Sequence, residues 1–316
     1  MIKIDDWVIE KGEKAQGKIK ITGYGIAMPA TVICGVKDGP TILITAGIHS
    51  AEYVGIQAAM ELAKEFQPEE LKGNVIIVPL VNVSGFEHRT MSLVYEDGKN
   101  LNRVFPGTVC GTDAEKLAAF LEERVIRRCD AIIDLHSGGG YEYLTPHIYF
   151  HGVAAPEVCE RSREMAMYAG VEYAVRSQAK NGFYSHAGTC GVPAVLIERG
   201  GCGLWTDAEV SADIADVKNI LRHLGVLCDG VDPIKMSPRV FDRGIYIDAP
   251  VSGCWYPAKR VGDRVNAGDS LGRICDIFGY PLHDERAEFD GIVLYQTASL
   301  GIEKNCPMVA YAVERG

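Results

Sequence analysis

The hydrophobic pattern between residues 41 and 225 alternates between two kinds of segment. Short, almost purely apolar runs predict buried strands at residues 41–47, 75–82, 131–136, 147–150 and 193–198. Between them, apolar positions that recur every three or four residues predict helices at residues 50–66, 112–129, 156–169 and 206–224. Alternating strands and helices predict an α/β fold, in which helices flank both faces of a mixed sheet.

The pattern changes after Val226. Short β-like runs separated by turn residues occur at 244–248, 253–256, 262–265, 268–274 and 291–295. Turn signals at this density predict a small β-barrel or sandwich. We therefore expect an α/β domain over residues 1–228 and a β-barrel domain over residues 229–316, with residues 229–233 as a linker. Residues 1–36 are expected to add an edge hairpin to the first domain.

Composition and charge narrow the class of protein. The chain has 316 residues, of which 47% are hydrophobic and 23% charged, as in an ordinary globular protein. The formal net charge of −10 argues against nucleic acid or an anionic membrane as a partner. The N-terminus has no apolar signal core, and no apolar run approaches the ~20 residues that cross a bilayer. Ten scattered cysteines include no C-x-x-C pair, so we expect a cytoplasmic protein.

The motif His49-x-x-Glu52 stands where the apolar run 41–47 gives way to a helical pattern. Side chains three residues apart on a helix point the same way, so this imidazole and carboxylate can converge on one ion. His136 ends another apolar run, and open α/β sheets bind ligands outside the carboxyl ends of their strands. Two histidines and a glutamate leave one zinc position free, which is the pattern of a catalytic site.

Three further motifs accompany His49-x-x-Glu52 in a fixed order. They are Asn-Leu-Asn-Arg-Val-Phe-Pro-Gly at 100–107, Asp-Leu-His-Ser at 134–137 and Leu-Ile-Glu-Arg-Gly-Gly at 196–201. The set resembles the zinc carboxypeptidase superfamily, and within it the succinylglutamate desuccinylase/aspartoacylase family. The resemblance covers roughly residues 40–225. It implies a zinc-carboxypeptidase-like fold and one Zn²⁺ per chain, held by His49, Glu52 and His136.

The resemblance also implies roles for other residues. Glu198 matches the carboxylate that activates the attacking water and then moves its proton, while Asn102 and Arg103 match the pair that grips the carboxylate of the substrate. Arg89 is the candidate for polarising the scissile carbonyl, and Tyr184 for a mobile tyrosine that contacts the substrate. Arginine suits such sites because its planar fork matches a carboxylate.

Blander interpretations of the same residues stay open at this point. His49 and His136 can be structural histidines, and Arg103 a surface residue. Glu198 ends an apolar run and would be costly to bury without a role. A structural salt bridge to Arg199 is its alternative. Asp134 can orient His136 as a neighbour of the metal site, or be structural.

The C-terminal part is similar to the biotinyl/lipoyl barrel-sandwich fold, on the residues 262–274 and 287–293. Those domains carry their cofactor on a lysine at a hairpin tip. The corresponding interval here, residues 275–286, contains no lysine. We therefore expect the barrel without the prosthetic group, either walling the mouth of the active site or building a homo-oligomer.

Together these features predict a zinc-dependent hydrolase that cleaves the amide bond of a small N-acyl amino acid. Three alternatives remain: a zinc carboxypeptidase on peptides, an esterase, and a non-catalytic module that binds metal or carboxylate. Glu198 argues against the last, because a mere binder needs no base beside the metal. The β-domain distinguishes the carboxypeptidase from the deacylase. If this domain overhangs the mouth of the active site, only small amides fit.

Overall fold

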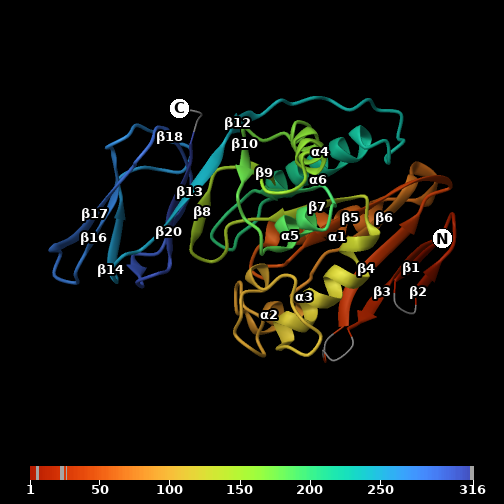
Figure 1. Ribbon diagram of the computed structural model, residues 1–316, viewed down its shortest axis with the longest axis horizontal. Helices are drawn as coiled ribbons and strands as arrows, with labels where there is room; N and C mark the ends of the chain where they lie inside the picture. The colour runs from red at the N-terminus through yellow and green to blue at the C-terminus, as the bar shows by residue number, and fades with distance from the viewer. Residues whose placement is uncertain (5–6, 22–24, 26, 314–316) are drawn as a thin grey trace.

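The computed structural model describes residues 1–4, 7–21, 25 and 27–313, and is built around a nine-stranded mixed sheet (Figure 1). The strand order is β12-β10-β9-β11-β7-β5-β6-β4-β3. Their bounds are β3 Lys14–Lys20, β4 Ala27–Cys34, β5 Lys37–Ala46, β6 Lys72–Val78, β7 Ala131–His136, β9 His147–His151, β10 Tyr173–Ser177, β11 Ala194–Glu198 and β12 Arg239–Phe241. The predicted α/β fold with a mixed sheet is confirmed.

The direction of each strand decides which strand ends lie together at the candidate site. The central strands β11, β7, β5 and β6 run parallel to one another. Next to β11, strand β9 runs antiparallel, and β10 and β12 run parallel to β9. The start of β9 therefore lies beside the carboxyl ends of β11 and β7. At the opposite edge β4 and β3 pair antiparallel, close to the hairpin expected within residues 1–36.

Helices cover both faces of this sheet. One face carries α1 Tyr53–Glu65, α4 Pro156–Ala166 and α6 Asp207–His223. The other carries α3 Asp113–Arg124 and α5 Phe183–Thr189, together with a small hairpin of β1 Ile2–Ile4 and β2 Trp7–Ile9. The remaining helical segments are α2 Val83–His88 and the 3₁₀ turns η1 Pro68–Glu70, η2 Leu101–Arg103 and η3 Ile126–Arg128.

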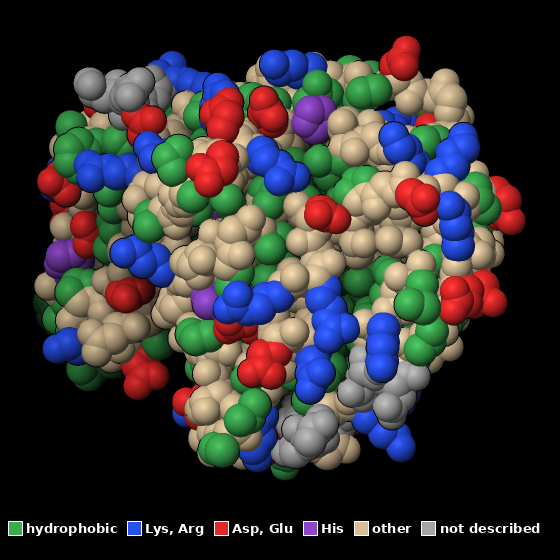
Figure 2. Space-filling model, turned by 45° about the vertical axis from the view of Figure 1, so that its right-hand side comes forward, with side chains coloured by type: hydrophobic (Ala, Val, Ile, Leu, Met, Phe, Trp, Pro, Cys, Tyr) green, Lys and Arg blue, Asp and Glu red, His purple; other side chains and the backbone are tan. Residues whose placement is uncertain are grey.

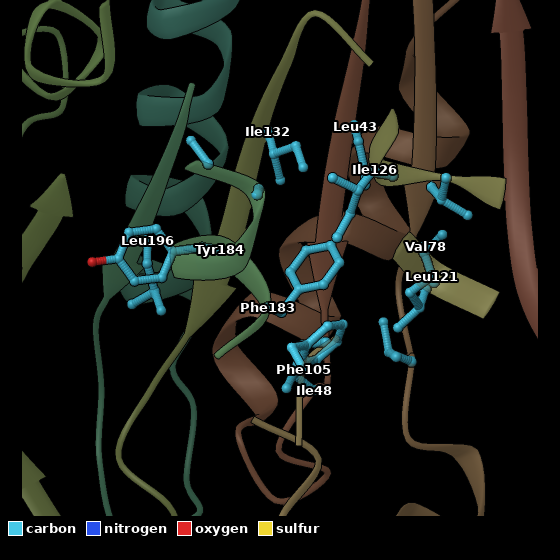
Figure 3. Close-up of a cluster of buried hydrophobic side chains, with 14 of the residues drawn as sticks. Leu43, Ile48, Val78, Phe105, Leu121, Ile126, Ile132, Phe183, Tyr184 and Leu196 are labelled. Carbon is cyan, nitrogen blue, oxygen red and sulfur yellow. The ribbon is translucent and has the colours of Figure 1, made fainter. Parts of the chain in front are cut away.

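Each face of the sheet has its own hydrophobic core. Val54 and Leu62 of α1 pack with Ile44 and Ile133 of the sheet on one side. On the other side, Phe183 of α5 lies against the central strands, as Figure 3 shows. Burying a large aliphatic or aromatic side chain contributes about 1.5–3 kcal/mol each. These two cores hold the strand ends, and with them the site, in fixed positions.

The C-terminal part forms two antiparallel sheets that enclose a third core around Trp255, Leu271 and Tyr311. One sheet has the order β13-β20-β18-β15, and the other β17-β16-β14-β19. The bounds are β13 Arg243–Asp248, β14 Gly253–Pro257, β15 Arg264–Val265, β16 Ser270–Cys275, β17 Pro281–Arg286, β18 Gly291–Thr297, β19 Gly301–Ile302 and β20 Pro307–Val313. This agrees with the predicted small β-domain.

Two strands connect the domains across the predicted boundary. β8, Glu142–Leu144, comes from the α/β part of the chain but pairs with β18 of the C-terminal part. β12 lies beyond residue 228 but pairs with β10 of the large sheet. The blue C-terminal strands thus stand directly beside the α/β domain in Figure 1.

The surface carries charges of both signs. Basic and acidic side chains are both spread over the face seen in Figure 2, despite the net negative charge. Among the described residues, no helix has the length and apolar character needed to cross a membrane.

Candidate active site

The turn between β5 and α1 brings His49 and Glu52 together. β5 ends at Ala46, and Gly47 follows with a φ of +66°, a conformation that L side chains rarely adopt. Glu52 is the N-cap of α1, and its amide donates to the carbonyl of His49 at 3.3 Å. Glu52 thus lies at the start of the helix, and His49 lies before it, so the two do not share a helix face as the spacing of the motif suggested. A tight turn before the helix, not the helix face, makes the two side chains converge.

The three predicted metal ligands meet around the Glu52 carboxylate. His49 Nδ1 lies 2.7 Å from Glu52 Oε1, and His136 Nδ1 lies 2.8 Å from Glu52 Oε2. The two imidazole rings are edge to face, with centroids 5.1 Å apart. One ligand atom from each of the three residues lies within 4.8 Å of the others. The structure thus places in one spot residues that are 84 positions apart in the chain.

The outer nitrogens of both histidines are held by acceptors. His49 Nε2 lies 3.1 Å from Asn100 Oδ1, and His136 Nε2 lies 3.1 Å from Asp134 Oδ2. The second oxygen of Asp134 accepts a hydrogen bond from Thr45 Oγ1 at 2.8 Å. These contacts place a proton on Nε2 of each histidine, so Nδ1 is the nitrogen that faces Glu52, with a proton or a cation between the two.

This donor set fits a zinc ion. Two imidazole acceptors opposite two carboxylate oxygens repel unless protons or a cation lie between them. Metal-binding histidines almost always donate their other N–H to a carboxylate or carbonyl, as both do here to Asp134 and Asn100. Nitrogen and oxygen donors in this number suit zinc. Asp134 orients His136, which was one of its two predicted roles.

Charge is concentrated in the same cluster. Burial raises the pKa of Glu52, but the His136 and His49 imidazoles outweigh burial and lower that pKa to about 2. Burial lowers the pKa of His136, yet Glu52 and Asp134 raise it well above the usual value for histidine. The cluster therefore keeps an ionised carboxylate, and a metal would displace the imidazole protons.

Glu198, the last residue of β11, lies next to this cluster. In the sheet register it pairs with His136 of β7 on one side and with His147 of β9 on the other. Its Oε2 is buried and has no hydrogen-bond partner in the described part of the chain. Burial, with the nearby Glu52 carboxylate, raises the pKa of Glu198 well above the usual value for glutamate. A raised pKa makes this carboxyl group a better proton acceptor than an ordinary glutamate, which suits a group that takes up a proton and passes it on.

Arg199 does not pair with Glu198. Successive strand residues point to opposite faces, and Arg199 turns toward α6. There it forms buried ion pairs with Asp213 at 3.3 Å and with Asp216 at 2.6 Å. The salt-bridge explanation for Glu198 is therefore not the one that the structure adopts.

His147 is a site residue that the sequence did not single out. Its Nδ1 lies 2.7 Å from the Thr145 carbonyl, which leaves Nε2 as a buried acceptor without a partner in the described residues. Burial lowers the pKa of His147 to about 4, so the imidazole is neutral. His147 starts its strand, and only the antiparallel direction of β9 brings it beside Glu198. The hydrophobic pattern of the sequence holds no signal for that direction.

These residues line a cavity of about 990 Å³. The C-terminal domain forms part of its wall through Tyr246 of β13 and Tyr295 of β18. The Tyr246 hydroxyl also donates to the Tyr149 hydroxyl of β9 at 2.8 Å. Pockets of this size suit small molecules. The C-terminal domain thus helps to enclose the site.

The residues predicted to contact the substrate fall into two groups. Arg103, Asn102 and Tyr184 all line the cavity. Asn102 Oδ1 accepts the Phe183 amide at 2.7 Å and so also anchors the start of α5. Arg89, by contrast, is exposed at the end of α2 with a φ of +57° and is not among the described residues that line the cavity. Its proposed catalytic role stays a prediction without a supporting contact, and Arg103 is the arginine of the cavity.

Residues 38–224 match the succinylglutamate desuccinylase/aspartoacylase catalytic domain. The chain belongs to this family. It is 30% identical, over 306 residues, to the N-alpha-acetyl-L-2,4-diaminobutyric acid deacetylase of Halomonas elongata. That match covers 93% of this chain and 88% of the relative. The predicted family is confirmed.

Solved structures agree with this assignment over both domains. A succinylglutamate desuccinylase/aspartoacylase from Rhodobacter sphaeroides is 26% identical with a TM-score of 0.85, and 98% of each chain is covered. The product-bound ectoine utilization protein EutE (DoeB) from Ruegeria pomeroyi shares the fold, with 24% identity, a TM-score of 0.87 and 98% coverage of each chain. The C-terminal domain therefore belongs to the shared architecture, together with the catalytic domain.

Proposed function

We propose that this protein is a zinc-dependent deacylase that hydrolyses the amide bond of a small N-acyl amino acid. The observation that carries the proposal is the unpaired, buried carboxylate oxygen of Glu198 beside the His49–Glu52–His136 cluster. Burying a carboxyl group without a partner is costly. A module that only binds a metal or a carboxylate would gain nothing from it, whereas a hydrolase needs a base at this position.

His49, Glu52 and His136 would hold the ion through three donors. When bound, zinc supplies Lewis acidity, which lowers the pKa of water towards about 7 and polarises a carbonyl. Glu198 takes a proton from the water that attacks the amide carbon and gives it to the leaving nitrogen. The C–O bond forms first, and the C–N bond breaks once the nitrogen has received the proton, so the products are the free acid and the amine.

Arg103 and Asn102 would orient the substrate. The guanidinium group of Arg103 can bind the α-carboxylate through two parallel hydrogen bonds. Because Asn102 Oδ1 is committed to the Phe183 amide, Asn102 offers its NH₂ group, a donor that suits a carboxylate or carbonyl oxygen. Fixing the substrate in this way lowers the entropic part of the barrier.

The charges of the cavity favour an amino acid with a cationic side chain. The described residues lining it include one arginine, Arg103, and no lysine, whereas Glu142 and Glu303 add carboxylates beyond the catalytic cluster. The Halomonas relative is named for an acetylated diamino acid, which carries both a carboxylate and a side-chain amine. We assign Glu142, whose Oε2 accepts the Gly139 amide at 3.0 Å, as the partner of that amine.

The enclosing C-terminal domain favours small substrates over peptides. Tyr246 and Tyr295 form part of the cavity wall, and a peptide substrate would have to extend past them. The test is to incubate metal-replete enzyme with N-acyl amino acids, among them N-α-acetyl-2,4-diaminobutyrate, and with a ten-residue peptide, and to measure released amine. We expect turnover of N-acyl amino acids and negligible trimming of the peptide. Steady trimming that disappears in Glu198→Gln would replace the deacylase by a carboxypeptidase.

A further inference from the structure

A second group of ligand-type side chains lies outside the cavity, between α3 and α5. Glu122 comes from α3, His186 from α5, and Cys190 follows the last residue of α5. His186 Nε2 lies 2.9 Å from Glu122 Oε2 and 3.4 Å from Cys190 Sγ. The three ligand atoms all lie within 4.8 Å of one another. None of these residues is among the described residues that line the catalytic cavity.

The local fold presents these side chains to one another. His186 and Cys190 are four residues apart, so they share one face of the helical segment. The opposing α3 supplies Glu122 to that face. The side chains of His186 and Glu122 are only 12% and 13% exposed, and the Phe105 ring lies 6.1 Å from the His186 ring. The cluster is thus largely buried but keeps some contact with solvent.

The hydrogen bonds around His186 fix its tautomer. Thr189 Oγ1 donates to the His186 carbonyl at 2.7 Å, so toward His186 Nδ1, at 3.0 Å, it can only accept. Nδ1 therefore carries a proton, and the Nε2 position faces the Glu122 carboxylate. A lone pair and a carboxylate oxygen 2.9 Å apart need a proton or a cation between them.

Glu122 is oriented in the same manner. Arg127 Nη2 lies 2.5 Å from Glu122 Oε1, which leaves Oε2 to face His186 and Cys190. Around a bound metal, each ligand residue usually has its second polar atom hydrogen-bonded to a neighbouring group. Both Glu122 and His186 have this arrangement, as His49 and His136 have it in the cavity.

We propose that Glu122, His186 and Cys190 form a second zinc site, separate from the catalytic one. Donors at zinc–ligand distances of about 2.0–2.3 Å in a tetrahedral site are separated by roughly 3.3–3.7 Å. The observed 3.4 Å between Nε2 and Sγ meets this, and Glu122 Oε2 needs only a small outward shift. The Glu122 carboxylate, which Arg127 also contacts, and a Cys190 thiolate would supply the anionic donors, and solvent would complete the fourth position.

This site would be structural. It ties α3 to α5, and α5 also carries Phe183 into the core and Tyr184 to the cavity wall. In Figure 3 the Phe183 ring lies next to the Phe105 ring, whereas the Tyr184 hydroxyl points away from both rings. Holding α5 against α3 would stabilise this part of the fold against unfolding. The competing explanation is an ion pair between a protonated His186 and Glu122, with Cys190 as a bystander.

The test is metal analysis of wild type and three variants after dialysis to constant zinc content. We expect about two zinc ions per chain in wild type, one in Cys190→Ser, one in His136→Ala, and two in Cys228→Ser, the matched change at an exposed cysteine. Cobalt replaces zinc in a parallel sample, because only a site with cysteine gives a thiolate-to-cobalt charge-transfer band. That band should persist in His136→Ala and vanish in Cys190→Ser.

A measurement on unaltered protein guards against misfolded variants. Zinc should protect Cys190 from alkylation in wild type, as mapped by mass spectrometry, while Cys228 reacts equally with and without zinc. One zinc per wild-type chain, no charge-transfer band and unprotected Cys190 would overturn the second site in favour of the ion pair. A band that survives while the cavity ion and turnover are lost would separate this inference from the proposed function.

Discussion

The described residues include two clusters of three ligand-type side chains, each with a glutamate against a histidine nitrogen, and the two clusters differ in their surroundings. Around Glu52, the neighbours are a cavity of about 990 Å³ and the unpaired carboxyl of Glu198. Around the second cluster, Arg127 contacts Glu122 and Thr189 contacts His186. Donor geometry is similar in the two places, but only the first has space for a substrate and a group that can move a proton.

The comparison separates metal binding from catalysis. The metal binding that we propose at both clusters rests on imidazole and carboxylate donors whose outer polar atoms are held by neighbours, and both clusters have such donors. Catalysis also needs an open coordination position, a base and a substrate clamp. Glu198 and Arg103 line the cavity, whereas the arginine beside Glu122, Arg127, is already paired with the Glu122 carboxylate.

The largest expected effect is that of His136→Ala. It removes one of three cavity donors and leaves a buried Glu52 carboxylate without its main partner. We expect loss of the cavity zinc and a fall in kcat of at least about 10²-fold, with the second cluster unaffected. Zinc content and amine release measured on the same preparation check this. Normal turnover in a variant that lacks the cavity ion would show that the reaction does not need the metal.

A matched pair of variants compares the groups that orient the two histidines. Asn100→Ala removes the acceptor of His49 Nε2, and Thr189→Val removes the acceptor of His186 Nδ1 with little change of shape. Each should weaken zinc binding about 10–100-fold at its own site only. Competition with a chromophoric chelator measures both affinities. If both variants lowered the affinity of the same site, the two clusters would not be independent.

Much of this arrangement could be predicted from the chain, for physical reasons. Apolar runs bounded by turn residues predicted β5, β7 and β11, and the family motifs placed His49, Glu52 and His136. The direction of β9 could not be predicted, because an apolar run looks the same in either direction. The short, Gly-containing α5 also lacks a helical pattern, so the pairing of His186 with Glu122 depends on tertiary contacts that the sequence does not display.

Arg103→Lys should have an intermediate effect on the catalytic site. It keeps the charge but loses the two-pronged geometry. The loss of one hydrogen bond to a charged group costs about 1.5–3 kcal/mol, so we expect KM to rise roughly 10-fold or more. The control is a substrate whose α-carboxylate is replaced by an amide, which should cost wild type far more than Arg103→Lys. Equal penalties in the two proteins would place the carboxylate clamp elsewhere.

Cys190→Ser should have the smallest effect on turnover. Cys190 lies outside the cavity, so kcat on the best N-acyl amino acid should stay within about 2-fold of wild type while the thermal midpoint falls. Initial rates and a thermal scan in the presence of zinc check this, with Cys228→Ser as the control. A kcat that fell as steeply as in His136→Ala would make the second cluster part of the catalytic machinery.

The most direct test of the account is Glu198→Gln, because this change keeps the shape of the side chain and removes its basicity. Zinc content and kcat are measured on the same sample, with Glu61→Gln, the same change at an exposed helix position, as control. We expect zinc content equal to wild type and a fall in kcat of at least about 10²-fold, while Glu61→Gln changes neither. Near wild-type kcat in Glu198→Gln would contradict the assignment of this cavity as the site of amide hydrolysis with Glu198 as its base.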